Sequence, residues 1–491
     1  QPLTELVNRS ILTGVIPHIW KSARITPIYK QKGSKGSCNS YRPISCLCAP
    51  AKILETIIKT QLSEYFEKNN LFGKSQHGFR SHRSTTTALL AMHTTWLEAL
   101  DRKKVVGLVT FDLTSAFDSI DVDILTSKLK IYGLDHMAIK WVKNYLTDRT
   151  QYVNIGTSKS QILTIKVGSP QGSVLSPVLF IILLADIDEW TSYAIVTGFA
   201  DDNPATVCDD SEEGVKEKLE TDAQNILTFM TSNKLIANDS KTTLMIFGRA
   251  NKQNSSPSTI KVGNATITEQ SEQRLLGVTI SSDLKWVTHT QQIKEKLHYS
   301  LYIMHHLRGF PTREALNIAA EGLFTSHLRY CISLYASIRT SPQDPIRTDL
   351  KKLQTMQNHM VRSIYNIKLS NRINMDRLRH DLGILSLNQT ACIASIAEFR
   401  KSLKFDTIPQ VSASLSSNKL VGRKKTRQET RGLIRLPRCT TSINQNGFLH
   451  TTGTIWNRLP ADIRDLEISQ RTFKNRLRKW IHDSDIPLPR N

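Results

Sequence analysis

Three aspartates in the first half of the chain have the surroundings expected of a cation site. Asp201 and Asp202 follow the apolar run Tyr193–Val196 and precede a second β-prone run that starts at Ala205, which predicts a hairpin with two carboxylates at its tip. Adjacent carboxylates repel each other, and a bound cation relieves that repulsion. Taken by itself, the Asp201–Asp202 pair is explained by the ordinary residue preferences of turns. Asp112, a third carboxylate at the end of another apolar strand, favours the cation site.

The elements around these aspartates predict how they come together. From Val105 to Phe247 the pattern is strand, helix, hairpin, helix, hairpin, helix, strand, which is typical of an α+β sandwich with helices on one face of a mainly antiparallel sheet. In such a sheet Asp112 can meet the tip of the Asp201–Asp202 hairpin. Two Mg²⁺ ions held ~3.5–4 Å apart by such carboxylates can clamp the attacking and leaving oxygens of a phosphoryl transfer.

Two further segments each have two interpretations. Gly168–Ser173 opens a buried helix predicted over Val174–Ile187, so it either brings backbone N–H groups close to a ligand or is an ordinary Gly/Pro turn. The loop Lys30–Gly36 either covers phosphates or is a solvated hairpin tip. Asp118 is interpreted as an acid at a helix N-terminus, where the helix dipole favours it.

Composition restricts the partners of the chain. Its 491 residues predict two or three domains, and its net charge of +22 favours a polyanion, nucleic acid first. No apolar run reaches the ~18 residues of a membrane span. Seven scattered cysteines form no disulfide or zinc pattern, which indicates free thiols in a reducing compartment. The chain opens at Gln1 without Met or a signal peptide, which suggests a fragment or a processed chain.

The order of several short motifs resembles that of one polymerase family. The palm-type motifs are Phe111–Asp112, Ala116–Asp118, Ser169–Gly172, Phe199–Asp202, Lys241–Thr242 and Leu275–Val278, and the fingers-type motifs are Ile25–Lys30, Tyr41–Ser45 and His77–Arg80. Together they resemble the reverse transcriptases of non-LTR (LINE-type) retrotransposons. One difference is Phe199, where many relatives have Tyr. The resemblance covers residues 1 to about 285.

The resemblance implies roles for individual residues. Asp112, Asp201 and Asp202 would hold two catalytic Mg²⁺ ions, with Mn²⁺ as a substitute, and Lys241 would protonate the leaving pyrophosphate. The nucleotide-binding residues would be Phe117 under the sugar, Gln171 and Gly172 along the nascent base pair, and Arg42, Arg24 and Lys30 at the triphosphate. The alternatives are a core aromatic for Phe117, a fingers ion pair for Arg42, and solvated charges for Lys241 and Arg24.

The resemblance also implies a right-hand polymerase fold. Residues 1–285 would form the fingers and palm, 286–400 a helical thumb-like region, and 401–491 a basic, partly disordered C-terminal region. That last region carries 18 Lys and Arg against 7 Asp and Glu, and its densest run is Arg423–Arg427, a nucleic-acid contact, a nuclear import signal or a solvated linker.

The function implied is that of an RNA-directed DNA polymerase in the nucleus or cytoplasm. Its partners would be an RNA template, a DNA or RNA primer and dNTPs, without a membrane. The alternatives are an inactive retroelement remnant that binds RNA, and another palm polymerase, such as an RNA-directed RNA polymerase.

Overall fold

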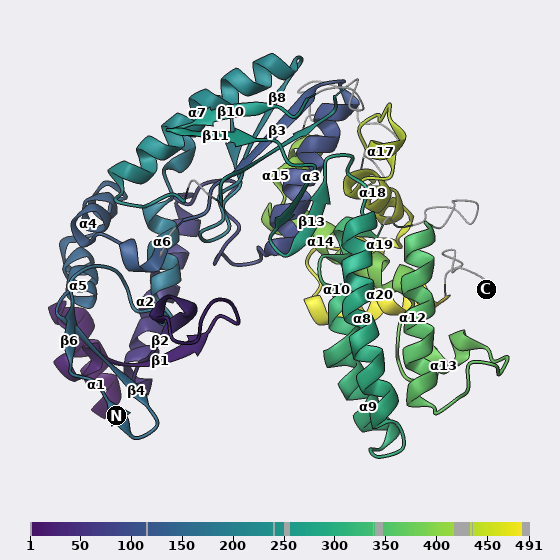
Figure 1. The fold of residues 1–491 in the computed structure, drawn as a ribbon, viewed down its shortest axis with the longest axis horizontal. Coiled ribbons are helices and arrows are strands. Elements are labelled where there is room, and N and C mark those ends of the chain that lie inside the picture. The colour runs from purple at the N-terminus through teal and green to yellow at the C-terminus, as the bar shows by residue number, and fades with distance from the viewer. Residues whose placement is uncertain are drawn as a thin grey trace.

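The structure, a computed structural model, describes residues 2–113, 116–238, 241–249, 256–336, 338, 347–416, 433–434 and 436–483. The N-terminal elements form one arm of an arch and the C-terminal helices form the other, with the central sheet between them (Figure 1). No helix within the described ranges is both long enough and apolar enough to cross a membrane.

The central sheet is antiparallel, as its strand pattern predicts. Its four strands stand in the order β7 (Ile195–Val196), β8 (Ala205–Asp209), β3 (Val105–Thr110) and β9 (Thr243–Phe247). Every residue of β3 from Val105 to Val109 is buried, which agrees with its uninterrupted apolar sequence.

Helices cover both faces of this sheet, and the prediction of helices on one face is therefore wrong in this detail. α7 (Glu212–Ser232) lies so close to one face that a side chain at Gly107 would meet Val215 and Leu219 at 2.5 Å. On the other face α3 (Thr85–Asp101) stacks Trp96 on Phe247, with ring centroids 4.9 Å apart. α3 is buried on most of its surface, because it packs on the sheet and on the C-terminal helices at once.

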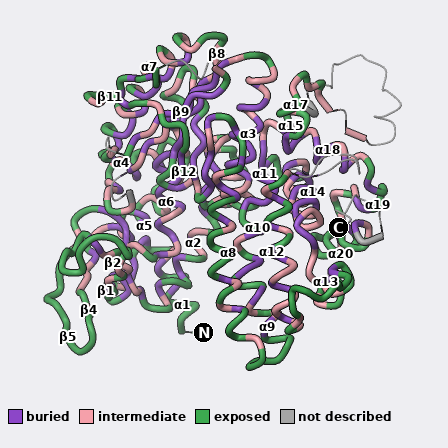
Figure 2. Tube along the Cα trace, turned by 45° about the vertical axis from the view of Figure 1, so that its right-hand side comes forward, coloured by how far each residue is buried: buried purple, intermediate pink, exposed green. Residues whose placement is uncertain are grey.

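The N-terminal arm combines helices with a second sheet. The helices are α1 (Pro2–Thr13), α2 (Ala49–Lys68), α4 (Val122–Ile131), α5 (His136–Leu146) and α6 (Ser176–Leu183). The strands are β1 (Ser22–Tyr29), β2 (Tyr41–Cys46), β4 (Arg149–Ile155), β5 (Ser158–Lys159) and β6 (Leu163–Ile165), in the order β2-β1-β4-β5 with β6 also paired to β4. The β1–β2 and β4–β5 hairpins project from the arm with many exposed residues (Figure 2). The buried helix predicted over Val174–Ile187 is α6, which is shorter and runs from Ser176 to Leu183.

Two small hairpins connect the central sheet to the C-terminal arm. They pair β10 (Thr259–Val262) with β11 (Ala265–Thr268), and β12 (Glu272–Leu275) with β13 (Val278–Ser281). The helices that follow are α8 (Val287–Leu307), α9 (Arg313–Ala320), α10 (Ser326–Arg329), α11 (Ile332–Tyr335), α12 (Thr348–Ile364), α13 (Met375–Asp381), α14 (Leu387–Phe405), α15 (Pro409–Ser416), α17 (Ser442–Gln445), α18 (Phe448–Arg458), α19 (Ala461–Arg464) and α20 (Gln470–Asp483).

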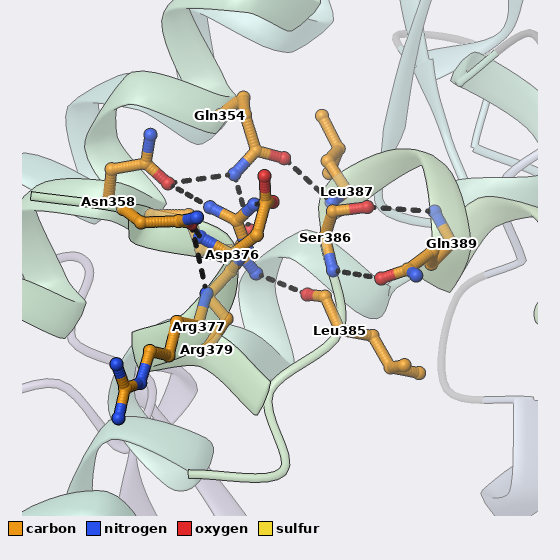
Figure 3. Close-up of polar contacts among 11 residues, drawn as sticks. Gln354, Asn358, Asp376, Arg377, Arg379, Leu385, Ser386, Leu387 and Gln389 are labelled. Atoms are coloured by element: carbon orange, nitrogen blue, oxygen red, sulfur yellow. Dashed lines mark hydrogen bonds and ion pairs between the residues drawn. The ribbon is translucent and has the colours of Figure 1, made fainter. Parts of the chain in front are cut away.

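A polar network holds three of these helices together (Figure 3). Gln354 of α12 accepts a hydrogen bond from the Leu387 amide at the start of α14 (2.8 Å), and its Nε2 donates to Asn358 (3.1 Å). Arg379 of α13 also binds Asn358, and it pairs with Asp376. The helical arm is thus fixed by directional bonds as well as by apolar packing.

Much of the region predicted as a basic tail is folded. Trp456 of α18 and Phe473 of α20 belong to the same apolar core as Trp96 of α3. The Asp101 carboxylate at the end of α3 accepts hydrogen bonds from the amides and hydroxyls of Thr440 and Thr441. α14 crosses residue 400, so the predicted division there does not separate two cores. The run Arg423–Arg427 lies outside the described residues.

Candidate active site

Asp201 and Asp202 lie in a tight turn between β7 and β8, as the sequence predicts. The Phe199 amide donates to the Asp202 carbonyl (2.8 Å), and the Asp202 amide donates to the Phe199 carbonyl (3.1 Å). Ala200 has φ +60°, a left-handed conformation that costs free energy for a residue with a Cβ atom. The buried Asn203 supports the turn, since its Nδ2 donates to the Asp201 carbonyl (3.2 Å).

Strand pairing brings Asp112 to this turn. Val109 of β3 pairs with Ala205 of β8 in antiparallel register. Asp112 is the third residue beyond Val109, and Asp202 is the third residue before Ala205. The register therefore puts the two aspartates at the same edge of the central sheet.

The charges at this edge are only partly neutralised. The Lys241 Nζ lies 2.7 Å from Asp112 Oδ2 and forms an ion pair with it. The Asp202 carboxylate is partly shielded from water, and this desolvation, together with the negative charges of Asp201 and Asp112, raises its pKa to about 6. Among the described residues, Lys241 is the one ion-pair partner of these three aspartates, so the described part of this edge has surplus negative charge.

The donor set fits a divalent cation in its chemistry. Carboxylate oxygens are the ligands that Mg²⁺ prefers, and a cation would favour the charged form of Asp202, which burial and the neighbouring charges of Asp201 and Asp112 disfavour. In the described part of the chain, however, no three His, Cys, Asp or Glu side chains already converge as a metal cluster. The residues fit the ion by type and charge, without a preformed cage.

Gln171 and Gly172 lie on a turn that is attached to the palm-type motif around Phe117. The Ser169 amide donates to the Phe117 carbonyl (2.9 Å), and Gln171 Nε2 donates to Asp118 Oδ2 (2.9 Å). A side chain at Gly168, which has φ +93°, would meet Asp118 at 2.6 Å, so only glycine permits this approach. Gln171 is thereby held against Asp118, the residue that follows Phe117.

Asp118 is not the N-terminal acid of the following helix, as its sequence position suggested. Asp121 caps α4 instead, accepting from the amides of Asp123 and Ile124. Asp118 lies one turn earlier, where burial raises its pKa and the hydrogen bond from Gln171 opposes that rise. No local signal distinguished the two acids, because the partner of Asp118 is distant in the sequence.

Phe117 is half-buried. Its ring packs on that of Phe180 in α6, with centroids 5.3 Å apart, so one face of Phe117 belongs to the core. Both the predicted role under a sugar and the alternative of a core aromatic remain compatible with this position.

Arg24, Lys30 and Arg42 lie along one hairpin. β1 and β2 pair Ile28 with Arg42, and the alternation of side chains along β1 places Arg24 and Ile28 on one face with Arg42, whereas Lys30 directly follows the last residue of β1. Arg24 and Arg42 are exposed, and Lys30 Nζ donates to the Asn39 carbonyl (2.9 Å). Among the residues that the structure describes, Arg42 has no ion-pair partner, so the fingers ion pair suggested as its alternative role is absent there.

A segment that the sequence did not mark as supporting the site braces the carboxylate turn. Gln76 pairs with Gly198 as an isolated parallel bridge, and the His77 amide donates to the Gly198 carbonyl (2.7 Å). A Cβ atom on Gly78 would lie 2.5 Å from the Ala200 amide nitrogen. The strained turn is thus backed by a glycine that leaves no room for a side chain.

Comparison with known proteins identifies the family. Residues 29–280, about half of the chain, match the family described as "Reverse transcriptase (RNA-dependent DNA polymerase)". The chain belongs to the reverse transcriptase family. The match covers the carboxylate turn, Asp112 and the Gln171 turn, and it confirms the predicted right-hand polymerase fold for this part of the chain. Members of this family work with divalent metal ions.

Curated relatives point to retroelements. The chain is 26% identical over 377 residues to the "Probable RNA-directed DNA polymerase from transposon BS" of Drosophila melanogaster, covering 74% of this chain and 40% of the relative. It is 28% identical over 306 residues to the "RNA-directed DNA polymerase from mobile element jockey" of the same species, covering 60% and 32%. The predicted resemblance to reverse transcriptases of non-LTR elements is confirmed. The chain spans two fifths or less of the length of these relatives.

Solved structures give a weaker likeness. A telomerase from Candida tropicalis in complex with a fragment of telomeric RNA aligns with a TM-score of 0.43 and 13% identity, covering 87% of this chain and 66% of that one. The same organism's telomerase without RNA aligns with a TM-score of 0.42 and 13% identity, covering 83% of this chain and 73% of that one.

The bracing of the carboxylate turn can be tested by substitution. Gly78→Ala should lower the free energy of unfolding by about 1–3 kcal/mol, because the new methyl group overlaps the backbone of Ala200 and forces it to move. Urea denaturation measures this difference. Gly36→Ala is the control, since its methyl group would meet only Ser34 at 3.7 Å. Equal stability of Gly78→Ala and the wild type would show that the segment does not brace the turn.

Proposed function

We propose that this chain is an RNA-directed DNA polymerase, the polymerase part of a non-LTR (LINE-type) retroelement. The observation that carries the proposal is the register of β3 and β8, which puts Asp112 at the same sheet edge as the Asp201–Asp202 turn. These carboxylates lie within the residues that match the reverse transcriptase family. The reaction would be attack of a primer 3′-hydroxyl on the α-phosphate of a dNTP, with release of pyrophosphate.

Asp112, Asp201 and Asp202 would hold two Mg²⁺ ions, or Mn²⁺ in their place. Bound in this way, the ions supply the positive charge that stabilises the attacking and leaving oxygens. Lys241 is ion-paired with Asp112 at 2.7 Å. Its ammonium group lies at the same sheet edge as the aspartates. Once a ligand breaks the ion pair with Asp112, this group would donate a proton to the leaving pyrophosphate.

The remaining site residues would orient the incoming nucleotide. Arg42 and Arg24 share one face of the β1–β2 hairpin and Lys30 follows the end of β1, a distribution of cations that suits contact with a triphosphate. Gln171 and Gly172 would lie along the nascent base pair, and the exposed part of Phe117 would exclude a 2′-hydroxyl. The helices after residue 286 would act as a thumb on the template–primer duplex.

The partners proposed are an RNA template, a DNA or RNA primer and dNTPs. The net charge of +22 supports a polyanionic partner. The seven cysteines form no disulfide pattern, and all are free thiols in the structure, which supports a reducing compartment, the nucleus or the cytoplasm.

The carboxylates provide the first test. Asp112→Asn and Asp201→Asn should each reduce primer extension on an RNA template by about 10²-fold or more, because a carboxamide keeps the shape but loses the charge that holds a cation. RNA affinity should stay within about twofold of the wild type, since the loss falls on the reaction. Extension rates and RNA titrations measure the two effects.

Asp210→Asn is the matched control, because Asp210 follows the far end of β8 and pairs with Lys104 at the surface. If either active-site variant extends the primer at the rate of this control, the replaced carboxylate takes no part in the reaction.

Sugar choice tests Phe117. Replacing Phe117 by Leu and then by Val should raise the use of rNTPs relative to dNTPs stepwise, since each smaller side chain leaves more room beside C2′. The ratio of kcat/KM values for one rNTP and its dNTP is the measurement, and circular dichroism checks the fold. If this ratio is the same for the wild type, the Leu variant and the Val variant, the role of Phe117 is only structural, in packing against Phe180.

Charge removal from the dense basic run tests its binding to phosphates. Truncation at residue 401 is unsuitable, because residues 436–483 complete the core around α3. Replacing Arg423, Lys424, Lys425 and Arg427 by Gln should flatten the dependence of log K for RNA on log[salt], by ~0.7–0.9 for each phosphate that the run binds in the wild type. A control that removes the same charge replaces Lys59, Lys68, Lys130 and Lys261 by Gln. Equal slopes for the wild type and the Arg423–Arg427 variant would exclude RNA binding by this run.

A further inference from the structure

Glu55 is a buried carboxylate that the reaction scheme leaves unused. It lies in α2 with only 2% of its surface exposed. Its Oε2 accepts a hydrogen bond from the Val174 amide at 2.7 Å, and its Oε1 is buried with no hydrogen-bond partner in the described part of the chain. Burial raises the pKa of Glu55, and the Val174 amide, the Tyr145 hydroxyl, the nearby charge of Arg149 and the Leu175 amide oppose this rise.

Val174 immediately follows the turn that carries Gln171. The Ser45 amide of β2 donates to the Gln171 carbonyl (2.7 Å), and the Tyr145 hydroxyl of α5 donates to Ser173 Oγ (2.9 Å). A Cβ atom on Gly172 would lie 3.0 Å from the Ser45 carbonyl oxygen. With the bond from Gln171 to Asp118, the turn is held from β2, from α5 and from the Phe117 motif, and Glu55 holds its C-terminal end from α2.

A carboxylate is a costly way to satisfy one amide. Burying a charged group costs more free energy than burying a neutral acceptor that would satisfy the same N–H. A carboxylate accepts a stronger and shorter hydrogen bond than a neutral group, so it restricts the position of the amide more tightly. The position restricted here is three residues from Gln171. Because the Val174 amide already donates to Glu55, it is not available to a ligand. It is therefore not one of the backbone N–H groups of this turn that could bind a ligand.

We propose that Glu55 is a positioning residue for the incoming nucleotide. It fixes the position of the Pro170–Ser173 turn, and therefore the position of Gln171 relative to the nascent base pair. Glu55 acts through Gln171 and does not touch the substrate. This inference rests on the proposed function, since it concerns how the polymerase binds its dNTP.

The test combines steady-state kinetics with a double-mutant cycle. Glu55→Gln keeps the shape and one acceptor oxygen but loses the charge, so it should raise the KM for dNTP about three- to tenfold while kcat and the Kd for primer–template stay within about twofold. The effects of Glu55→Gln and Gln171→Ala on KM should not add, because both remove the same positioned contact. A residue that only stabilises the fold would change the unfolding temperature without this selective and non-additive effect on KM.

Glu64→Gln is the matched control, since Glu64 lies on the exposed side of the same helix. If Glu55→Gln unfolds below the assay temperature, Glu55→Asp takes its place, because it keeps the charge but is too short to reach the Val174 amide unchanged. An unaltered KM, or effects on KM that add, would overturn the proposal.

Hydrogen exchange separates this inference from the proposed function. Peptides spanning residues 168–176 should exchange faster in Glu55→Gln than in the wild type, and Glu64→Gln should leave them unchanged. If the wild type extends no primer, the proposed function fails, and unchanged exchange in Glu55→Gln would then also overturn the role of Glu55 in holding the turn. If the wild type extends primers and only the Glu55 effects are missing, the inference about Glu55 fails alone.

Discussion

The antiparallel register between β3 and β8 is the constraint on which the rest of the structure depends. Val109 opposite Ala205 puts Asp112 and the Asp201–Asp202 turn at one sheet edge, where burial, together with the negative charges of Asp201 and Asp112, raises the pKa of Asp202 to about 6. Such an arrangement persists only if the surrounding structure holds it. Helices on both faces of the sheet, the Lys241 ion pair and the close approach of Gly78 to the turn supply that support.

A second turn, Gly168–Ser173, is held by similar means. Glycines at both ends allow close approach to Asp118 and Ser45, and the buried Glu55 binds the amide that follows. The two turns are therefore held in the same way: at each of them a glycine allows two backbone segments to approach so closely that a side chain would not fit between them. Rigid placement of this kind is what a reaction between positioned groups requires.

The local features of the site could be predicted from the sequence, because they depend on neighbours in the chain. The strand before Asp112, the hairpin with Asp201 and Asp202, and the Gly/Pro turn around Gln171 all have local signals. The partners of Gly78, Glu55 and Asp118 could not be predicted, since each is distant in the sequence and no periodic pattern marks it. The folded C-terminal helices were missed for a related reason: the high charge of this region drew attention away from the apolar residues, such as Phe473 and Leu477, that enter the shared core.

Template-directed copying by the wild-type chain tests the central claim most directly. The chain is given a labelled DNA primer annealed to an RNA template of defined sequence, all four dNTPs and Mg²⁺, and the products are sequenced. The account predicts DNA complementary to the RNA, no product when EDTA removes the divalent cation, and much less product with rNTPs. A folded chain that binds the template and primer but adds no nucleotide, or that adds nucleotides unrelated to the template sequence, would contradict it.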